Sequence, residues 1–119
     1  MTQHSAPPLK RIYEPRAAQD GTRVLVERLW PRGVSKQDPR IDQWLKEIAP
    51  SPELRAWFGH EPARWAEFQR RYRAELAGNA EAVARLRALL AQGPVTLVYA
   101  ARDPEINSAR VLREWLGEQ

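Results

Sequence analysis

The sequence predicts an α/β fold: a small, mainly parallel sheet flanked by helices in a Rossmann-like three-layer sandwich, built from a single domain. Two apolar runs, at residues 23–29 and 95–100, have strand character, and helical patterns lie between and after them. Apolar strands joined through helical crossovers are most easily parallel. A chain of 119 residues is long enough for one domain to bury a core.

The first elements along the chain are strands. A weak strand is expected at residues 9–13, followed by a turn at residues 19–21. The next strand, residues 23–29, carries Glu27 and Arg28 in its middle and runs into a basic loop at residues 30–36. Charge inside a buried strand has a cost unless it is paired or faces a polar pocket, so this segment indicates a site.

Helix starts are predicted where a capping residue precedes a proline, because the cap accepts an orphan backbone N–H and proline gives up a donor that the helix would not use. Four dipeptides fit this pattern, with Glu61 the poorest cap: Asp38-Pro39, Ser51-Pro52, Glu61-Pro62 and Asp103-Pro104.

The apolar spacing fills in these helices. The first is expected to bury Ile41, Trp44, Leu45 and Ile48, and a short second helix ends at Gly59. The third and fourth are separated by a break at residues 78–79, and the fourth ends at residues 93–94. The strand at residues 95–100 then leads into a last helix that starts at Asp103.

Composition limits the classes of function. The net charge is +4, carried by 16 Arg and only 3 Lys, a bias that indicates either anionic partners or genome composition. The absence of cysteine excludes disulfides and thiol chemistry, and the expected location is cytoplasmic.

Residues 1–8 are expected to be a disordered tail without the apolar core of a signal peptide, and residues 9–117 are expected to form the domain. No apolar run is long enough to span a membrane.

In parallel sheets, ligands lie beyond the carboxyl ends of the strands, which here are the loops at residues 30–36 and 101–103. We expect a crevice there for a small anionic, phosphate-like ligand, with the last helix pointing its N-terminus inward. Trp30 is a possible stacking platform. The other expected ligand-binding residues are Arg28, Arg32, Ser35, Lys36, Tyr99, Arg102 and Asn107.

Two classes of function follow from this crevice and from the arginine content. The first is a protein, enzyme or not, that binds an anionic or phosphorylated ligand, with Glu27 or Asp103 as an acid-base partner. The alternative is a nucleic-acid-binding accessory protein or regulator that uses arginine-rich helical faces. His60 could cap a helix, pack or carry a proton. No metal site is expected, and the cofactor and oligomeric state are left open.

Four segments also resemble the YeaO-like family of small bacterial proteins, a domain of unknown function. They are residues 23–36, Trp44-Leu45-Lys46-Glu47-Ile48-Ala49-Pro50-Ser51, Leu54-Arg55-Ala56-Trp57-Phe58-Gly59-His60 and Tyr99-Ala100-Ala101-Arg102-Asp103. The resemblance covers residues 9–117 and implies a compact cytoplasmic α/β domain without an established activity, although some members carry a transcription-regulator label. Ile106 and Ser108 stand where the family often has histidines, so no histidine chemistry is carried over to that segment.

Overall fold

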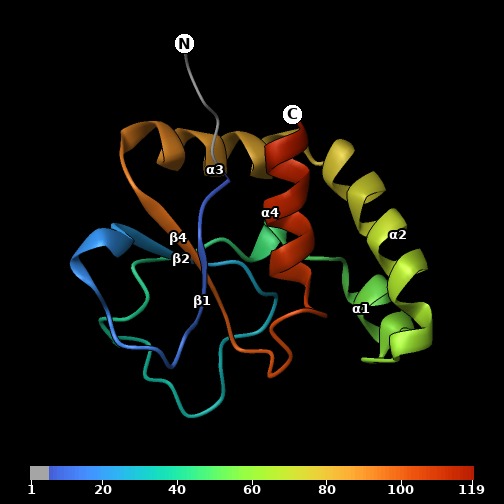
Figure 1. Ribbon diagram of the computed structural model, residues 1–119, viewed down its shortest axis with the longest axis horizontal. Coiled ribbons are helices and arrows are strands. Elements are labelled where there is room, and N and C mark those ends of the chain that lie inside the picture. Colours follow the sequence, from blue (N-terminus) through green and yellow to red (C-terminus); the bar gives the residue numbers. More distant parts are fainter. Residues whose placement is uncertain (1–5) are drawn as a thin grey trace.

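The computed structural model describes residues 6–119 of the chain. Within that range one sheet of four parallel strands has the spatial order β1-β4-β2-β3 (Figure 1). The strands are β1 (Leu9–Arg11), β2 (Thr22–Leu25), β3 (Gln43–Trp44) and β4 (Val95–Tyr99). The last strand in the sequence therefore lies between the first two. The predicted α/β fold, with a parallel sheet flanked by helices, is confirmed.

Helices make up most of the rest of the described chain. The α-helices are α1 (Pro52–Phe58), α2 (Trp65–Ala77), α3 (Ala80–Gln92) and α4 (Ser108–Glu118). Short 3-10 helices are η1 (Ala18–Asp20), η2 (Lys46–Ile48) and η3 (Pro62–Arg64). In Figure 1, α4 lies beside the strands, α3 crosses the end of the molecule where the C-terminus lies, and α1 and α2 lie farther out.

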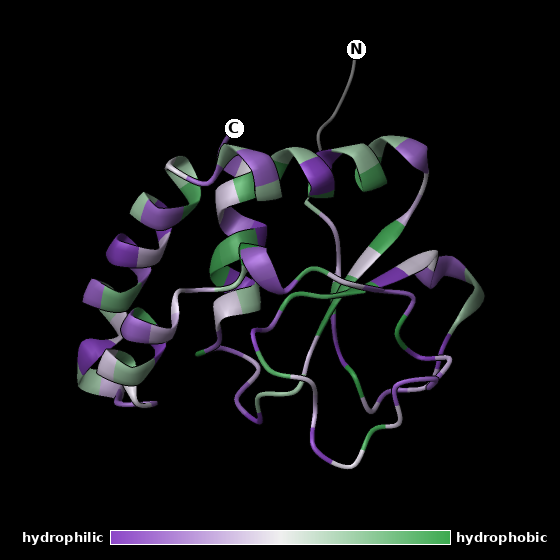
Figure 2. Cartoon of the chain, turned by 180° about the vertical axis from the view of Figure 1, so that it is seen from behind, coloured by the Kyte–Doolittle hydropathy of each residue, from purple (hydrophilic) through white to green (hydrophobic). Residues whose placement is uncertain are grey.

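The two faces of the sheet are covered differently. Val24 and Leu97 point to the face where the α-helices form the main core. Leu25 and Val98 point to the opposite face and pack with Ile12, because successive side chains of a strand alternate between faces. The layer on this second face consists of irregular segments, from which Trp30 and Ile41 pack against the sheet beside Trp44 of β3. Figure 2 shows the hydrophobic colouring of β4 and the hydrophilic segments that recur along α2.

The outer edge of β1 is closed by its own turn. The backbone N–H of Arg11 donates to the Glu14 carboxylate at 2.8 Å, and the Glu14 N–H donates to the Arg11 carbonyl at 3.0 Å. The contacts of this segment continue before Leu9, since the Leu97 N–H donates to the Pro8 carbonyl and Arg113 donates to the Pro7 carbonyl, each at 2.9 Å. Of the expected tail, residues 1–5 lie outside the described residues.

Helix α1 begins and ends where the sequence predicts. The Ser51 hydroxyl accepts from the Leu54 N–H at 3.1 Å, and Gly59 ends the helix in the left-handed region with φ 54°. Glu61 makes no side-chain cap, and η3 precedes α2 at that point. The expected break at residues 78–79 separates α2 from α3.

The helix predicted from Asp38 over residues 41–48 is wrong. Asp38 instead forms a turn, in which its carboxylate accepts from the Arg40 backbone N–H at 2.9 Å. Trp44 then pairs with Leu25 as β3, and the Leu45 N–H donates to the Leu25 carbonyl at 2.9 Å. The backbone of residues 43–45 therefore forms its hydrogen bonds with the edge of β2 and not within a helix. The apolar stripe divides between the two faces of the sheet, with Ile41 and Trp44 on one and Leu45 and Ile48 on the other.

The last helix begins later than the sequence predicts. Asn107 caps α4, since its side chain accepts from the Arg110 N–H at 2.9 Å. Asp103 forms a separate turn in which its carboxylate accepts from the Glu105 and Ile106 N–H groups at 2.8 and 3.0 Å. Asp and Asn both compete for nearby backbone donors, and Asn107 is the residue that stands directly before the apolar stripe.

The expected strand at residues 23–29 is also shorter, because β2 ends at Leu25. Glu27 and Arg28 therefore follow the strand instead of lying in its middle. The charged side chain inside β2 is Arg23, which is fully buried and forms a 2.8 Å ion pair with Asp20. All five N–H groups of its guanidinium have acceptors. Besides Asp20, these acceptors are the carbonyl oxygens of Ile12, Glu14, Pro15 and Arg40.

We expect Asp20→Asn to lower the free energy of unfolding by about 3–5 kcal/mol, because it leaves the buried Arg23 without its counter-charge. Hydrogen bonds from the Ala17 N–H, Lys10 and Arg23 hold the pKa of Asp20 at about 2, below the ordinary 3.8. The stabilisation is therefore present above the ordinary value and is lost as the pH falls towards about 2.

Urea denaturation of both proteins between neutral pH and acid checks this. The difference between wild type and Asp20→Asn should shrink as the pH falls through that window. Glu67→Gln, which breaks exposed ion pairs on α2, is the control and should change stability much less. Equal effects of the two substitutions would contradict the role given to the buried pair.

Candidate functional site

A cavity of about 400 Å³ opens at the carboxyl ends of β2 and β4. One wall is the segment that follows β2, residues 27–32, and another is the start of the segment that follows β4, residues 100–101. Helix α1 with His60, residue Phe68 of α2 and the start of α4 complete the lining. The cavity therefore lies at the edge of the sheet where the sequence predicts the crevice.

Basic side chains outnumber acidic ones in the lining. Arg28, Arg32 and Arg55 contribute guanidinium groups, and Glu27 is the one carboxylate among the lining residues. Within residues 6–119, none of these three arginines forms an ion pair, whereas nine other basic residues do. Arg32 and Arg55 are exposed, so their side chains are available to a ligand.

Arg28 is held more firmly than the other two arginines. Its terminal nitrogen donates to the carbonyl oxygens of Ala49 and Pro50, at 3.1 and 3.3 Å. Its Nε is buried and has no acceptor among residues 6–119. A buried donor without an acceptor is costly, so an oxygen atom that reached this nitrogen would be stabilised by it.

Glu27 connects the ends of β2 and β4. Its carboxylate accepts from the Ala100 backbone N–H at 3.0 Å, and its own carbonyl accepts from the Trp44 indole at 2.8 Å. Burial raises the pKa of the Glu27 carboxyl, an effect that the Ala100 and Ala101 N–H groups, Arg55 and His60 oppose. The main-chain bonds between the two segments end with the Val26 N–H, which donates to the Val98 carbonyl at 3.3 Å, and the Glu27 side chain supplies the next link.

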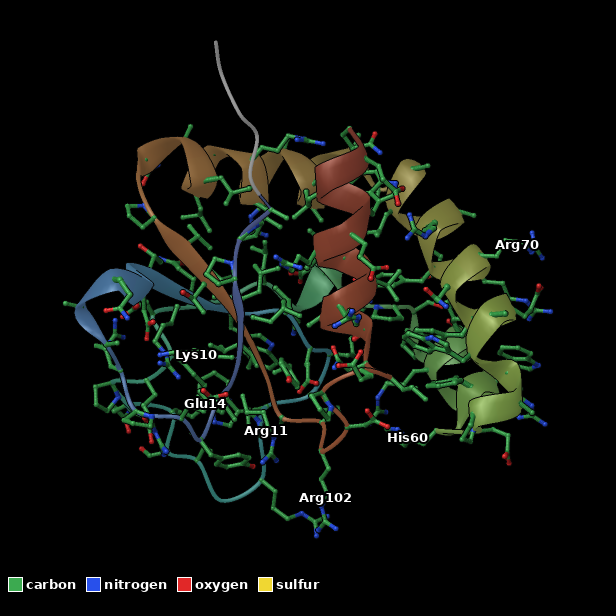
Figure 3. The ribbon with its side chains drawn as sticks, viewed as in Figure 1. Lys10, Arg11, Glu14, His60, Arg70 and Arg102 are labelled. Atoms are coloured by element: carbon green, nitrogen blue, oxygen red, sulfur yellow. The ribbon has the colours of Figure 1, made fainter. Side chains whose placement is uncertain are left out.

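Two aromatic core residues reach the cavity wall. The rings of Phe58 and Phe68 stack with their centroids 4.4 Å apart, and both side chains are almost completely buried. His60 lies beside them, exposed at the end of α1, with a left-handed φ of 58° (Figure 3). Two consecutive left-handed residues, Gly59 and His60, turn the chain sharply here and bring the imidazole to the cavity rim.

The structure brings together only part of the expected site. Glu27, Arg28, Trp30, Arg32 and Asn107 line the cavity, and the Asn107 side chain is also the cap of α4. Five expected residues do not line it: Ser35, Lys36, Tyr99, Arg102 and Asp103.

Each of these five has another environment, which for Asp103 is the turn before α4 described above. Lys36 places its ammonium 5.1 Å from the Trp30 ring and 5.2 Å from the Trp44 ring, on the loop-covered face of the sheet. Ser35 bonds to Gln37, and Tyr99 is buried in the helix-side core, where burial raises the pKa of its phenol. Figure 3 shows Arg102 pointing away from the body of the protein.

Sequence reasoning missed Arg55 and the two phenylalanines as cavity residues. Arg55 lies in a seven-residue helix whose apolar positions indicated packing. A signal was present, because Leu54 and Phe58 define the buried side of α1 and leave Arg55 at its margin. Arg55 faces the cavity because of the direction in which α1 packs, and a single sequence does not specify that direction.

Three arginines of α2, part of the arginine-rich helical faces behind the nucleic-acid alternative, form ion pairs. Arg70 and Arg71 both pair with Glu67, at 2.5 and 2.8 Å. Arg73 pairs with Glu114 at 3.4 Å and also with Glu118. This surface is an alternation of charges rather than a basic stripe.

Within residues 6–119, no group of three or more acidic, histidine or cysteine side chains could hold a metal ion. None of the helices in the same range combines the length and the apolar character needed to cross a membrane.

The fold and the cavity define a class, a small parallel α/β domain with a cationic pocket at the carboxyl ends of its strands. The chain belongs to the family DUF488-N3i, described as the inactive DUF488-N3 subclade, which it matches over residues 8–119. It is 46% identical to the uncharacterized protein YeaO of Escherichia coli over 90% of this chain and 93% of that protein. The resemblance to YeaO-like proteins is confirmed.

Mycobacterial relatives show the same level of similarity. The uncharacterized protein Rv3073c of Mycobacterium tuberculosis is 46% identical over 89% of each chain, as is Mb3100c of Mycobacterium bovis. No solved structure gives a significant match to the chain.

We expect Glu27→Ala to lower the free energy of unfolding by about 1–3 kcal/mol, because the Ala100 N–H loses its acceptor. Since the folded-state pKa of Glu27 is raised above 4.5, its contribution is largest below that pH and declines as the pH rises through the raised value. Urea denaturation at about pH 4 and pH 7 measures both effects.

Glu14→Ala is the matched control, since Glu14 also accepts a backbone N–H, but at the exposed edge of β1. Water can replace Glu14 there, so this substitution should cost less than Glu27→Ala. If Glu27→Ala lowered the free energy of unfolding more at pH 7 than at pH 4, the raised pKa of Glu27 would be contradicted.

Proposed function

We propose that this protein binds a small organic or inorganic anion, carrying a phosphate or carboxylate group, in the cavity at the carboxyl ends of β2 and β4. The observation that carries the proposal is the set of three guanidinium groups around one cavity, none of which forms an ion pair with a carboxylate of residues 6–119. Arginine forks match the geometry of carboxylate and phosphate oxygens.

The three arginines have different parts in this proposal. Arg28 is fixed by two carbonyl oxygens and offers its buried Nε to a ligand oxygen. Arg32, on the loop after β2, and Arg55, on α1, come from separate elements and remain free to close on the anion. The N-terminus of α4 at Ser108, which lines the cavity, adds a favourable dipole for negative charge.

We infer that the site binds its ligand without transforming it. The carboxylate of Glu27 is engaged by backbone N–H groups, so we propose that it positions the cavity wall rather than transferring protons. Asp103, the other acid-base candidate, lies outside the cavity and bonds to its own turn. The description of the subclade as inactive agrees with this view.

Binding of nucleic acid through the helical faces is the less favoured function, because Glu67, Glu114 and Glu118 neutralise the arginines of α2. A basic surface for duplex DNA needs several cations free to replace counterions along the phosphates. The cytoplasmic location remains a prediction.

Inorganic phosphate should raise the thermal stability of the wild-type protein at low ionic strength, and titration calorimetry should give its affinity. We expect Arg55→Gln and Arg32→Gln each to weaken phosphate binding about tenfold or more, since a hydrogen bond to a charged group contributes about 1.5–3 kcal/mol. Arg102→Gln and Arg70→Gln are matched controls outside the cavity and should leave the affinity unchanged.

Duplex DNA serves as the competing probe in the same experiment. If phosphate fails to bind, or if all four variants weaken it equally, the cavity proposal is wrong. Stabilisation by DNA alone, lost in Arg70→Gln and removed by salt, would favour the helical faces instead.

A further inference from the structure

The lining of the cavity has a second chemistry that a bare oxyanion would not use. Beside the arginines it presents apolar side chains from four separate segments: Leu29, Trp30, Phe58, Phe68 and Ile106. A volume of about 400 Å³ also falls within the range of about 300–1,000 Å³ typical of sites for organic ligands. The apolar lining and the volume both bear on the part of the ligand that is attached to its anionic group.

Leu29 is the clearest sign of an unfilled apolar contact. Its side chain is 56% exposed and lines the cavity, on the segment that also carries Arg28 and Arg32. Among residues 6–119, Tyr13 is the one other large hydrophobic residue that is exposed, and it lies outside the cavity. Apolar surface at the rim of a cationic pocket gains stability when an apolar group covers it.

A second part of the cavity lining is an apolar wall that belongs to the core. Phe58 and Phe68 belong to the main core and stack on each other, so their positions do not depend on a ligand. Ile106, half-buried against the same core, extends this wall towards the start of α4. A ligand with an apolar body would therefore contact a wall that is already formed, which limits the entropy lost on binding.

We propose that the ligand is an amphipathic anion: a phosphate monoester or a carboxylate that carries a ring or short chain about as large as a phenyl group. This inference rests on the proposed function and specifies its ligand class. The anionic group would bind Arg28, Arg32 and Arg55, and the apolar body would lie between Leu29 and the Phe58 wall.

Titration calorimetry with four probes tests this inference: phenyl phosphate against inorganic phosphate, and benzoate against acetate. In each pair the aromatic probe should bind at least tenfold more tightly, because burial of an apolar group as large as a phenyl ring raises the affinity by about tenfold or more. Arg55→Gln should weaken all the probes that bind.

Leu29→Ser separates the apolar contact from the charge. It should weaken phenyl phosphate about threefold and leave inorganic phosphate unchanged, since Leu29 is apolar and half of its surface is already exposed. Tyr13→Ser removes the other exposed apolar side chain and should change neither affinity. Both positions are exposed, so neither variant should lose its fold.

The outcomes distinguish this inference from the proposed function. If inorganic and phenyl phosphate bind equally and Arg55→Gln weakens both, the anion site stands and the amphipathic ligand class is wrong. If no probe binds, the proposed function itself fails. If phenyl phosphate binds more tightly but neither Arg55→Gln nor Leu29→Ser affects it, the ring is held elsewhere and the inference is overturned.

Discussion

Arg23 lies in the middle of the sheet on β2, with a fully buried guanidinium whose acceptors come almost entirely from chain segments without regular structure. Asp20 balances its charge, and carbonyl oxygens on either side of β2 in the sequence, among them those of Glu14 and Arg40, complete its hydrogen bonds. Within residues 6–119 no α-helix packs on this face, so these bonds take the place of a packed helix in holding the loops. The segment before β2, at Ile12, Glu14 and Pro15, and the loop after it, at Arg40, are tied to the sheet by this one desolvated cation.

The contrast between Arg23 and Arg28, five residues apart, separates a structural arginine from a candidate binding one. Arg23 has every donor satisfied within the protein, whereas the Nε of Arg28 is buried without an acceptor. Glu27 stands between β2 and the cavity and ties the ends of two strands together. The charged side chains of this segment therefore change role along the sequence. Arg23 forms an ion pair inside the sheet, Glu27 links the ends of two strands, and Arg28 and Arg32 line the cavity.

Much of this organisation could be predicted from the sequence, because local chemistry decides it. Ser51 and Gly59 delimit α1 through capping rules, and the β-branched run of β4 is apolar on both faces, as a central parallel strand requires. The helix expected over residues 41–48 failed because its spacing of apolar residues also suits a segment that crosses from one face of a sheet to the other. Arg55 was missed for a related reason, since the cavity depends on how α1 packs and not on its own sequence.

The closed edge of β1 has a consequence for how copies of this protein meet. A bare strand edge offers unpaired N–H and C=O groups to any other extended chain, and so invites sheet-to-sheet joining and aggregation. Here the Glu14 carboxylate and N–H occupy the outward-facing groups of Arg11, and the opposite edge, β3, is only two residues long. Each border therefore offers few main-chain groups to a further strand, so the small sheet is a poor template for growth by edge pairing.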